Sequence, residues 1–233
     1  MLTVLITGAN RGIGLGFTRA YLKKGWEVIA TCRNPEKANE LKGLSGNLEV
    51  HALDVTDFAA VDSLAGELTG RAIDVLINNA GILGSPSFEK GGAGQTLGDM
   101  DYDGLRHTLE VNTIAPLKIV EAFLDQVAAS DQKKIITITS AMGSLAAMEG
   151  EFISYRTSKT AVNSIMRNLS IGLKEKGITV AVLHPGWVRT DMGSEAAPLA
   201  VEESVEGLIR EIDKLHLEHT GCCKDHTGET IPW

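Results

Sequence analysis

Short apolar runs rich in β-branched residues alternate with longer amphipathic stretches along most of the chain. The apolar runs predict strands over residues 3–7, 27–31, 47–53, 75–78, 134–140 and 179–185. The amphipathic stretches predict helices over residues 13–24, 35–44, 58–68, 102–128, 155–176 and 201–215. A strand that leads through a helix to the next strand pairs with it in parallel, and the helices cover both faces of the sheet. We therefore expect an α/β fold built on a doubly wound parallel sheet.

The size and composition of the chain fit one domain of this kind. A chain of 233 residues with 43% hydrophobic content can fill a continuous core, and no linker, repeat or low-complexity tract divides it. The formal net charge of -8 argues against binding of nucleic acid or an anionic membrane through bulk charge. The first apolar run is too short for a signal peptide, and no run reaches membrane-spanning length. We expect a single domain over residues 1–233, with no nucleic-acid or membrane partner.

Cysteine usage points to a reducing compartment. Cys32, Cys222 and Cys223 offer neither a disulfide framework nor the spacing of a metal site. We expect reduced thiols in a cytoplasmic protein and no bound metal, while the meaning of the adjacent Cys222 and Cys223 stays open.

A glycine-rich turn, Thr7-Gly8-Ala9-Asn10-Arg11-Gly12-Ile13-Gly14, joins the first predicted strand to the first predicted helix. Glycines here let the chain bend sharply and let a pyrophosphate approach the main-chain N–H groups at the positive end of the helix. The spacing differs from the common dinucleotide fingerprint, and an ordinary tight turn also needs glycine. The position between the first strand and a helix nevertheless favours a Rossmann-type dinucleotide-binding fold.

The residues after the second predicted strand bear on which dinucleotide binds. In such a fold they lie nearest the adenosine ribose, where an acidic residue would accept hydrogen bonds from the 2′-hydroxyl of NAD. This chain has Arg33 there, and Arg11 lies in the glycine-rich turn. Two guanidinium groups suit a 2′-phosphate, although both could simply be solvated. The sequence therefore favours NADP (NADPH), with NAD less likely.

Polar residues also follow the third and fourth predicted strands. Asp54, which precedes Val55, can accept a hydrogen bond from the adenine amino group. Asn78-Asn79-Ala80-Gly81 supplies two amides and a glycine where a cofactor would cross the sheet. Each of these could alone be a cap or a turn.

Tyr155 and Lys159 lie four residues apart in a predicted helix and so share one face. An ammonium group beside a phenol favours the phenolate and could lower its pKa from about 10 toward 7 or 8, where the group can give and take protons. Ser140, at the end of the fifth predicted strand, can donate a hydrogen bond to a carbonyl oxygen. A Tyr-x-x-x-Lys pair alone is also frequent on ordinary helices, so the rest of the chain must support the interpretation.

These features together resemble the short-chain dehydrogenase/reductase family. The resemblance rests on Thr7 to Gly14, Asp54, Asn78 to Gly81, Asn112, Ser140, Tyr155, Lys159, Pro185 and Gly186, and it extends from the first strand to about Gly193. It implies hydride transfer in which Tyr155 is the proton donor or acceptor, Lys159 holds the nicotinamide ribose, and Ser140 orients the carbonyl. It also implies that Asn112 kinks its helix and holds a water linked to Lys159.

The resemblance implies specific cofactor contacts as well, with Thr190 near the carboxamide. The catalytic residues would be Asn112, Ser140, Tyr155 and Lys159. The cofactor-binding residues would be Gly8, Asn10, Arg11, Gly12, Ile13, Gly14, Arg33, Asp54, Val55, Asn79, Ala80, Gly81, Tyr155, Lys159, Pro185, Gly186, Val188 and Thr190. His184 could suggest a histidine base, but we interpret it as a positional feature of its turn.

Two features depart from the usual family pattern. Tyr155 follows Ser140 by fifteen residues, two more than is common, so either the loop over residues 141–154 carries a bulge or Ser144 shares the role of Ser140. We favour Ser140, because Ser144 lies past the turn at Gly143. The segment after Met192 is short, which predicts an open, permissive pocket.

Within the family, the chain resembles a subgroup of C-factor-like and Sniffer-like carbonyl reductases. We expect reduction of a small carbonyl substrate, an aldehyde or ketone, by NADPH. The apolar pocket candidates are Leu145, Met148, Phe152 and Trp187, any of which could equally be core. The glycine-rich segment over residues 85–98 is either a mobile loop at the edge of the site or an ordinary surface connection. The alternative is an NADP(H)-binding signalling or regulatory protein whose output is partner binding. By family analogy, the helices over residues 102–128 and 155–176 would pair in a homodimer or homotetramer.

Overall fold

Seven strands form one parallel sheet in the order β3-β2-β1-β4-β7-β8-β9. The computed structural model describes residues 1–84 and 92–233. The strands are β1 (Thr3–Thr7), β2 (Glu27–Cys32), β3 (Leu48–Ala52), β4 (Val75–Asn78), β7 (Lys134–Ile138), β8 (Thr179–His184) and β9 (Cys223–Asp225). In register, Val4 of β1 lies between Val28 of β2 and Val75 of β4. This sheet confirms the Rossmann-type fold expected from the alternation of strands and helices.

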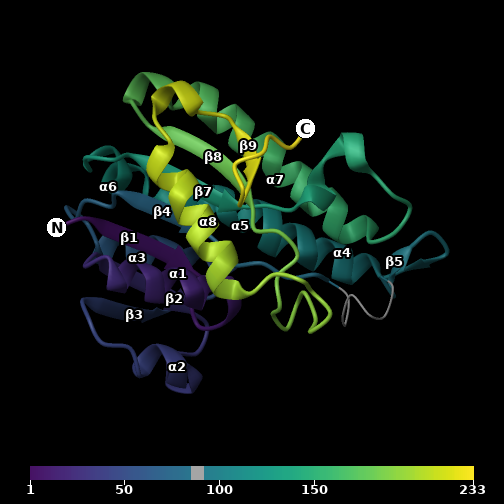
Figure 1. The fold of residues 1–233 in the computed structure, drawn as a ribbon, viewed down its shortest axis with the longest axis horizontal. Helices are drawn as coiled ribbons and strands as arrows, with labels where there is room; N and C mark the ends of the chain where they lie inside the picture. The colour runs from purple at the N-terminus through teal and green to yellow at the C-terminus, as the bar shows by residue number, and fades with distance from the viewer. Residues whose placement is uncertain (85–91) are drawn as a thin grey trace.

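Helices cover both faces of the sheet. Figure 1 shows α1 (Gly12–Lys23) and α8 (Val201–Lys214) side by side on the near face. On the far face lie α3 (Phe58–Glu67), α5 (Ala115–Ala122) and α7 (Ile153–Gly172). The remaining helices are the short α2 (Asn39–Lys42), α4 (Tyr102–Leu109) and α6 (Leu124–Ala128). Among the described residues, no helix combines the length and apolar character needed to cross a membrane.

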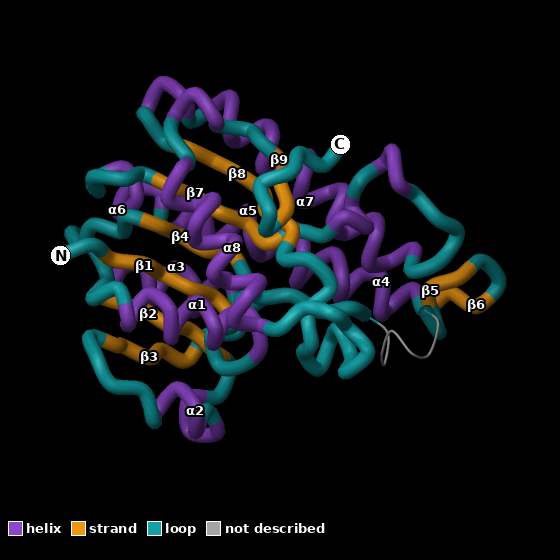
Figure 2. The backbone as a smooth tube through the Cα atoms, viewed as in Figure 1, coloured by secondary structure: helices purple, strands orange, loops and turns teal. Residues whose placement is uncertain are grey.

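Alternation of side chains along β1 shows how the sheet divides the core. Val4 and Ile6 are fully buried against the near-face cluster, which includes Phe17 of α1 and Leu208 of α8. Leu5, between them, is buried in the far-face cluster. The central strands are therefore apolar on both faces, as expected for a parallel sheet covered on both sides. The tube in Figure 2 shows the strands enclosed between these helices.

The structure corrects two of the strand expectations. It adds β9 at the sheet edge next to β8, where the sequence predicted no strand; its three residues, Cys-Lys-Asp, are too few and too polar to give a strand signal. It also places a small antiparallel hairpin, β5 (Gln95–Thr96) and β6 (Asp99–Met100), where a mobile loop was expected. The first part of that loop, residues 85–91, lies outside the described residues.

The helix predicted over residues 102–128 is broken into three. A π-helical turn, Glu110–Ile114, separates α4 from α5, and Phe123 separates α5 from α6. Pro116 has no N–H to donate to the carbonyl four residues earlier, that of Asn112, so a regular helix cannot continue here. The helix predicted over residues 35–44 is likewise reduced to a 3-10 turn, Pro35–Lys37, and α2, because Ala38 between them is non-helical at φ -88° and ψ 60°.

The order of the strands fixes where a ligand can bind. From β1 the chain proceeds through β2 and β3 to one edge of the sheet, and from β4 it proceeds through β7 and β8 to the other. A crevice therefore opens at the carboxyl ends of β1 and β4, where doubly wound folds bind their ligands. Thr7 and Asn78 end these two strands, and Ser140 follows β7 on the same edge.

Candidate active site

The glycine-rich turn leads directly from β1 into α1. Gly8 and Gly12 have φ values of +67° and +52°, in the left-handed region that favours glycine. A Cβ on Gly14 would come within 2.3 Å of the Gly8 carbonyl oxygen, so the turn also needs glycine for close packing. No side chain among the described residues caps the amino end of α1, and its first turn contains no acidic residue. The free N–H groups and the helix dipole make this end suitable for a phosphate.

Thr7 joins the end of β1 to the segment that follows β4. Its hydroxyl accepts hydrogen bonds from the backbone N–H groups of Asn79 and Ala80, at 3.0 and 3.1 Å. The Asn79 side-chain amide donates back to the carbonyls of Thr7 and Gly8, at 2.9 and 3.1 Å. The two sides of the crevice are therefore held at a fixed distance, and the amides expected to contact a cofactor also have this structural role.

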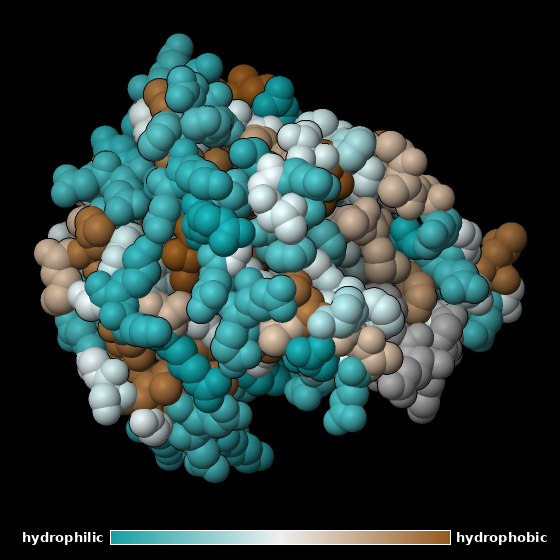
Figure 3. Space-filling view, in the orientation of Figure 1, coloured by the Kyte–Doolittle hydropathy of each residue, from teal (hydrophilic) through white to brown (hydrophobic). Residues whose placement is uncertain are grey.

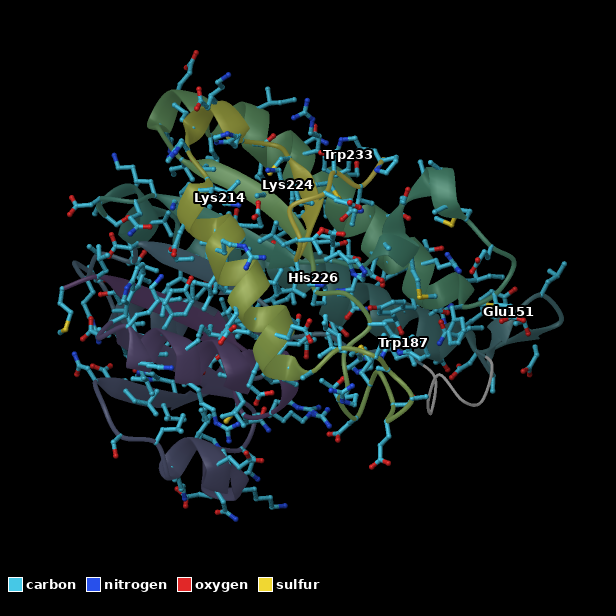
Figure 4. All side chains as sticks on the ribbon, viewed as in Figure 1. Glu151, Trp187, Lys214, Lys224, His226 and Trp233 are labelled. Carbon is cyan, nitrogen blue, oxygen red and sulfur yellow. The ribbon has the colours of Figure 1, made fainter. Side chains whose placement is uncertain are left out.

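The segment after β8 closes over the glycine-rich turn. Gly186 has a φ of +84°, and a Cβ on Gly12 would lie 3.2 Å from the Thr190 methyl group. Arg11 forms an exposed ion pair with Asp191 at 2.6 Å. Figure 4 labels Trp187 in this segment; its indole N–H donates to the Gly193 carbonyl at 2.6 Å. The short segment is thus a bonded loop rather than an open edge.

The residues expected near the adenosine lie together at the ends of β2 and β3. Arg33 is exposed, and Val55 beside Asp54 is buried. The Thr56 N–H and hydroxyl donate to one carboxylate oxygen of Asp54, at 3.0 and 2.8 Å. The Thr56 hydrogen bonds, and more weakly the charge of Arg33, hold the pKa of Asp54 below its ordinary value. Asp54 is therefore an ionised acceptor, and Arg33 is a nearby exposed cation.

Tyr155 and Lys159 extend from the first turns of α7 into the crevice. Both are buried, with 6% of each exposed, and the Lys159 Nζ lies 5.8 Å from the centre of the Tyr155 ring. The Lys159 ammonium donates to the Ile138 carbonyl at 3.0 Å. Lys159 also approaches Gly81, where a Cβ would lie 3.7 Å from its Nζ. Helix α7 thus brings both groups against the ends of β4 and β7.

Burial, rather than the neighbouring ammonium, dominates the ionisation of the pair. It raises the pKa of Tyr155 to about 12, and the hydrogen bond with the Ser140 side chain acts in the opposite direction. Burial also lowers the pKa of Lys159 to about 8. Burial therefore opposes the lowering of the Tyr155 pKa that was expected from Lys159, because both charged forms lose hydration.

The structure places Ser140, rather than Ser144, against the tyrosine hydroxyl. The Ser140 side chain hydrogen-bonds with Tyr155 and caps the turn that follows, accepting from the Met142 N–H at 3.2 Å. Ser144 is buried, and its hydroxyl has no partner in the described part of the chain. The long loop between Ser140 and Tyr155 is taken up by two 3-10 turns, Ala141–Gly143 and Leu145–Ala147. The expected bulge therefore exists and leaves Ser140 at the site.

Asn112 lies in the π-helical turn and links three segments. Its side-chain oxygen accepts from the Ile82 N–H at 2.9 Å, and its amide donates to the Ile82 carbonyl at 2.8 Å and the Ser158 hydroxyl at 3.0 Å. The side chain therefore fixes the segment after β4 to α7. The missing N–H of Pro116 leaves the Asn112 carbonyl without its regular helical donor.

The apolar pocket candidates divide into two groups. Phe152 is buried with Tyr155 and Leu83 in a small cluster beside the crevice. Leu145 and Met148 are 64% and 42% exposed, so they are not core residues.

His184 keeps a neutral ring, because burial lowers its pKa to about 4, and this agrees with a positional role.

Two residues that the sequence did not single out organise this region. Arg156, 5% exposed, donates to the carbonyls of Ala147 and Glu151, at 3.2 and 3.0 Å, and forms an ion pair with Glu149. Gln95 of β5 bonds to the first turn of α7. The position of Arg156 next to Tyr155 is a weak sequence signal for its role, whereas Gln95, in a glycine-rich loop, has no such signal.

Across residues 1–84 and 92–233, no three His, Cys, Asp or Glu side chains converge in the manner of a metal site.

Comparison with known proteins finds relatives along the whole chain. The family model for short chain dehydrogenases matches residues 2–199. The C-signal protein of Myxococcus xanthus is 40% identical over 162 residues, which cover 69% of this chain and 93% of that protein. The structure of the NADPH-bound carbonyl reductase from chicken fatty liver matches with a TM-score of 0.89 and 36% identity, covering 99% of this chain and 98% of that one. Carbonyl reductase Sniffer of D. melanogaster matches with a TM-score of 0.90 and 32% identity over 100% of both chains. The chain therefore belongs to the short-chain dehydrogenase/reductase family, among relatives that include C-signal and Sniffer-like carbonyl reductases.

Proposed function

We propose that this protein is an NADPH-dependent reductase of small aldehydes or ketones. The observation that carries the proposal is the grouping of three side chains at the carboxyl ends of the strands: the buried Tyr155 phenol, its hydrogen-bond partner Ser140, and Lys159, whose Nζ lies 5.8 Å from the centre of the Tyr155 ring. The Tyr155 phenol can give a proton to the substrate oxygen as hydride arrives at its carbon, and can take that proton back in the reverse reaction.

The residues of the crevice fit a dinucleotide phosphate. The uncapped amino end of α1 offers N–H groups to the pyrophosphate, and the ionised Asp54 can accept from the adenine amino group. Arg33 and Arg11 are exposed cations that suit a 2′-phosphate. The chicken relative of similar fold binds NADPH, which supports the same choice. A bound nicotinamide would supply the hydride.

The residues of this chain would handle the proton and the substrate oxygen. The Tyr155 hydroxyl donates its proton to the carbonyl oxygen as negative charge develops there, and the Ser140 hydroxyl holds the same oxygen. Lys159 uses one of its three N–H donors on Ile138 and has two left for ribose hydroxyls. Burial of Tyr155 and Lys159 keeps water from competing for these bonds.

The test is NADPH oxidation, followed by absorbance, over a panel of aldehydes, ketones and quinones, with NADH in parallel. Replacing Tyr155 with phenylalanine removes only the hydroxyl, so we expect kcat to fall by about 10² to 10⁴ with NADPH affinity nearly unchanged. The matched control is Tyr102→Phe, on a residue 64% exposed at the start of α4, which should keep wild-type activity. Full activity of Tyr155→Phe would refute the mechanism. Tight NADPH binding with no turnover on any substrate would shift support to the regulatory alternative.

We propose that the protein also pairs with copies of itself through α5 and α7. Leu117 of α5 and Ile171 of α7 are apolar side chains that are 37% and 66% exposed on these helices. Light scattering with size exclusion should report a dimer or tetramer, and a monomer at all concentrations would contradict the pairing.

A further inference from the structure

We propose that Gln95 is the positioning residue for Tyr155: its side-chain amide holds the first turn of α7 against the segment after β4 and so fixes the phenol. Gln95 is 1% exposed, although it lies on the two-residue strand β5 of a surface hairpin. Its Oε1 accepts from the Tyr155 N–H at 2.9 Å, and its Nε2 donates to the Leu83 carbonyl at 3.0 Å. This inference rests on the function proposed above.

The hydrogen bond from Tyr155 to Gln95 pairs one of the backbone N–H groups that have no partner within the helix at its amino end. The first N–H groups of a helix have no partner within the helix and need one from elsewhere. Helix α7 begins after Phe152, whose side chain has no hydrogen-bonding group and whose backbone is left-handed at φ 55°. Tyr155 is the third residue of α7, so its N–H is one of these unpaired donors, and Gln95 supplies its acceptor from 60 residues away. A buried N–H without that acceptor would destabilise this turn.

Gln95 and Asn112 make similar hydrogen bonds to neighbouring residues of the segment after β4, Gln95 to Leu83 and Asn112 to Ile82. The Asn112 amide bonds to both backbone groups of Ile82 and to Ser158 of α7. The Gln95 amide bonds to Leu83 and to Tyr155 of the same helix. Two buried amides thus join consecutive residues after β4 to the first turns of α7.

The hairpin around Gln95 also packs against the residues that flank Tyr155. A Cβ on Gly92, just before β5, would lie 3.3 Å from the Phe152 backbone nitrogen. Leu83, Phe152 and Tyr155 are packed in one apolar cluster. In Figure 4, Glu151 is labelled at the same end of the molecule, beside the hairpin labelled β5 in Figure 1. Leu97, between β5 and β6, is 93% exposed, and Figure 3 shows a small group of hydrophobic atoms at this tip beside hydrophilic ones.

The experiment compares Gln95→Met with Gln126→Met. Methionine has nearly the length of glutamine and keeps the packing, but at position 95 it removes both side-chain hydrogen bonds. Gln126 is the control: it is 6% exposed, its Nε2 donates to the Ala65 carbonyl at 2.8 Å, and its main-chain carbonyl accepts from the Ile73 N–H just before β4, at the end of that strand away from Tyr155. We expect both variants to lose some thermal stability. Only Gln95→Met should lower kcat, by about ten- to a hundredfold, with the Kd of NADPH within about twofold of wild type, because a small misplacement of a reacting group slows the reaction without affecting cofactor binding.

The outcomes separate this inference from the proposed function. Wild-type kcat in folded Gln95→Met, with Tyr155→Phe inactive, overturns the positioning role alone, whereas an active Tyr155→Phe overturns the function itself. Equal losses of kcat in Gln95→Met and Gln126→Met would show a general structural effect and also refute it. If Gln95→Met does not fold, hydrogen exchange of the wild-type protein decides: the Tyr155 amide should be protected as strongly as the amides of the next turn of α7, and fast exchange would refute the bond.

Discussion

Replacing Lys159 with methionine should stabilise the protein at neutral pH while it removes the reductase activity. Lys159 is 6% exposed, and its pKa is lowered from 10.5 to about 8 by burial. A pKa of about 8 in place of 10.5 means that holding the charged ammonium lowers the stability of the folded state by about 3 kcal/mol. Loss of the hydrogen bond to the Ile138 carbonyl destabilises the variant by about 1 kcal/mol and offsets part of this gain. We expect the variant to be more stable by about 2 kcal/mol at pH 7.

The stability difference between wild type and Lys159→Met should also depend on pH, with a sign that follows from the lowered pKa of Lys159. Because the folded pKa lies below the unfolded one, the unfolded chain binds more protons between about pH 8 and 10.5, and Lys159 makes wild-type stability rise with pH in this window. The advantage of Lys159→Met should therefore shrink by about 2 kcal/mol between pH 8 and about 9.5. Burial raises the pKa values of Tyr21 and Cys223, and these groups lower the stability of both proteins alike at high pH, so they cancel in the difference.

Urea unfolding followed by tryptophan fluorescence measures this difference at each pH. A free-energy difference between wild type and Lys159→Met that stays constant from pH 7 to about 9.5 would refute the reasoning, because it would mean that the ammonium is not desolvated in the folded protein. Lys118→Met is a suitable control: Lys118 pairs with Asp62 at the surface of α5, and its removal should give no such pH dependence.

Three further predictions concern the cofactor and the serine. Arg33→Ala should weaken NADPH binding at least tenfold, about 1.4 kcal/mol, and leave NADH almost unchanged in titration calorimetry; equal losses would refute the 2′-phosphate role. Asp191→Ala should tighten NADPH binding severalfold, because it frees Arg11 from the 2.6 Å ion pair, and weaker binding would show that the pair assists the cofactor instead. Ser140→Ala should lower kcat by about a hundredfold or more, whereas Ser144→Ala should keep it within about threefold, and steady-state kinetics with equal losses would contradict the assignment.

The sequence predicted the elements that have strong periodicity or clear turn chemistry. β1, β4 and the start of α7 lie close to their expected positions, because buried parallel strands and long amphipathic helices give clear patterns. Strand β9 was not predicted, because three residues ending in Lys-Asp carry no period and pair only through their place beside β8. The break at Glu110–Ile114 was predicted only through Asn112, although Pro116 gives a physical reason for it.

The candidate site was predicted in composition but not in electrostatics. Spacing alone indicates that Tyr155 and Lys159 share a helix face, and the structure places them together as expected. The spacing does not indicate how deeply the two side chains are buried, and this burial raises the pKa of Tyr155 and lowers that of Lys159. Gln95 was missed for a related reason: its role comes from contacts with Leu83 and Tyr155 that lie far away in the sequence.

Transfer of deuterium from the nicotinamide C4 of labelled NADPH tests the central claim most directly. In a single turnover with an aldehyde substrate, the account predicts that the label appears on the carbinol carbon of the product, detected by mass spectrometry. It predicts further that Tyr155→Phe, loaded with the same cofactor, transfers at least about a hundredfold more slowly. Product that carries no label, or labelled product formed by Tyr155→Phe at the wild-type rate, would contradict the account.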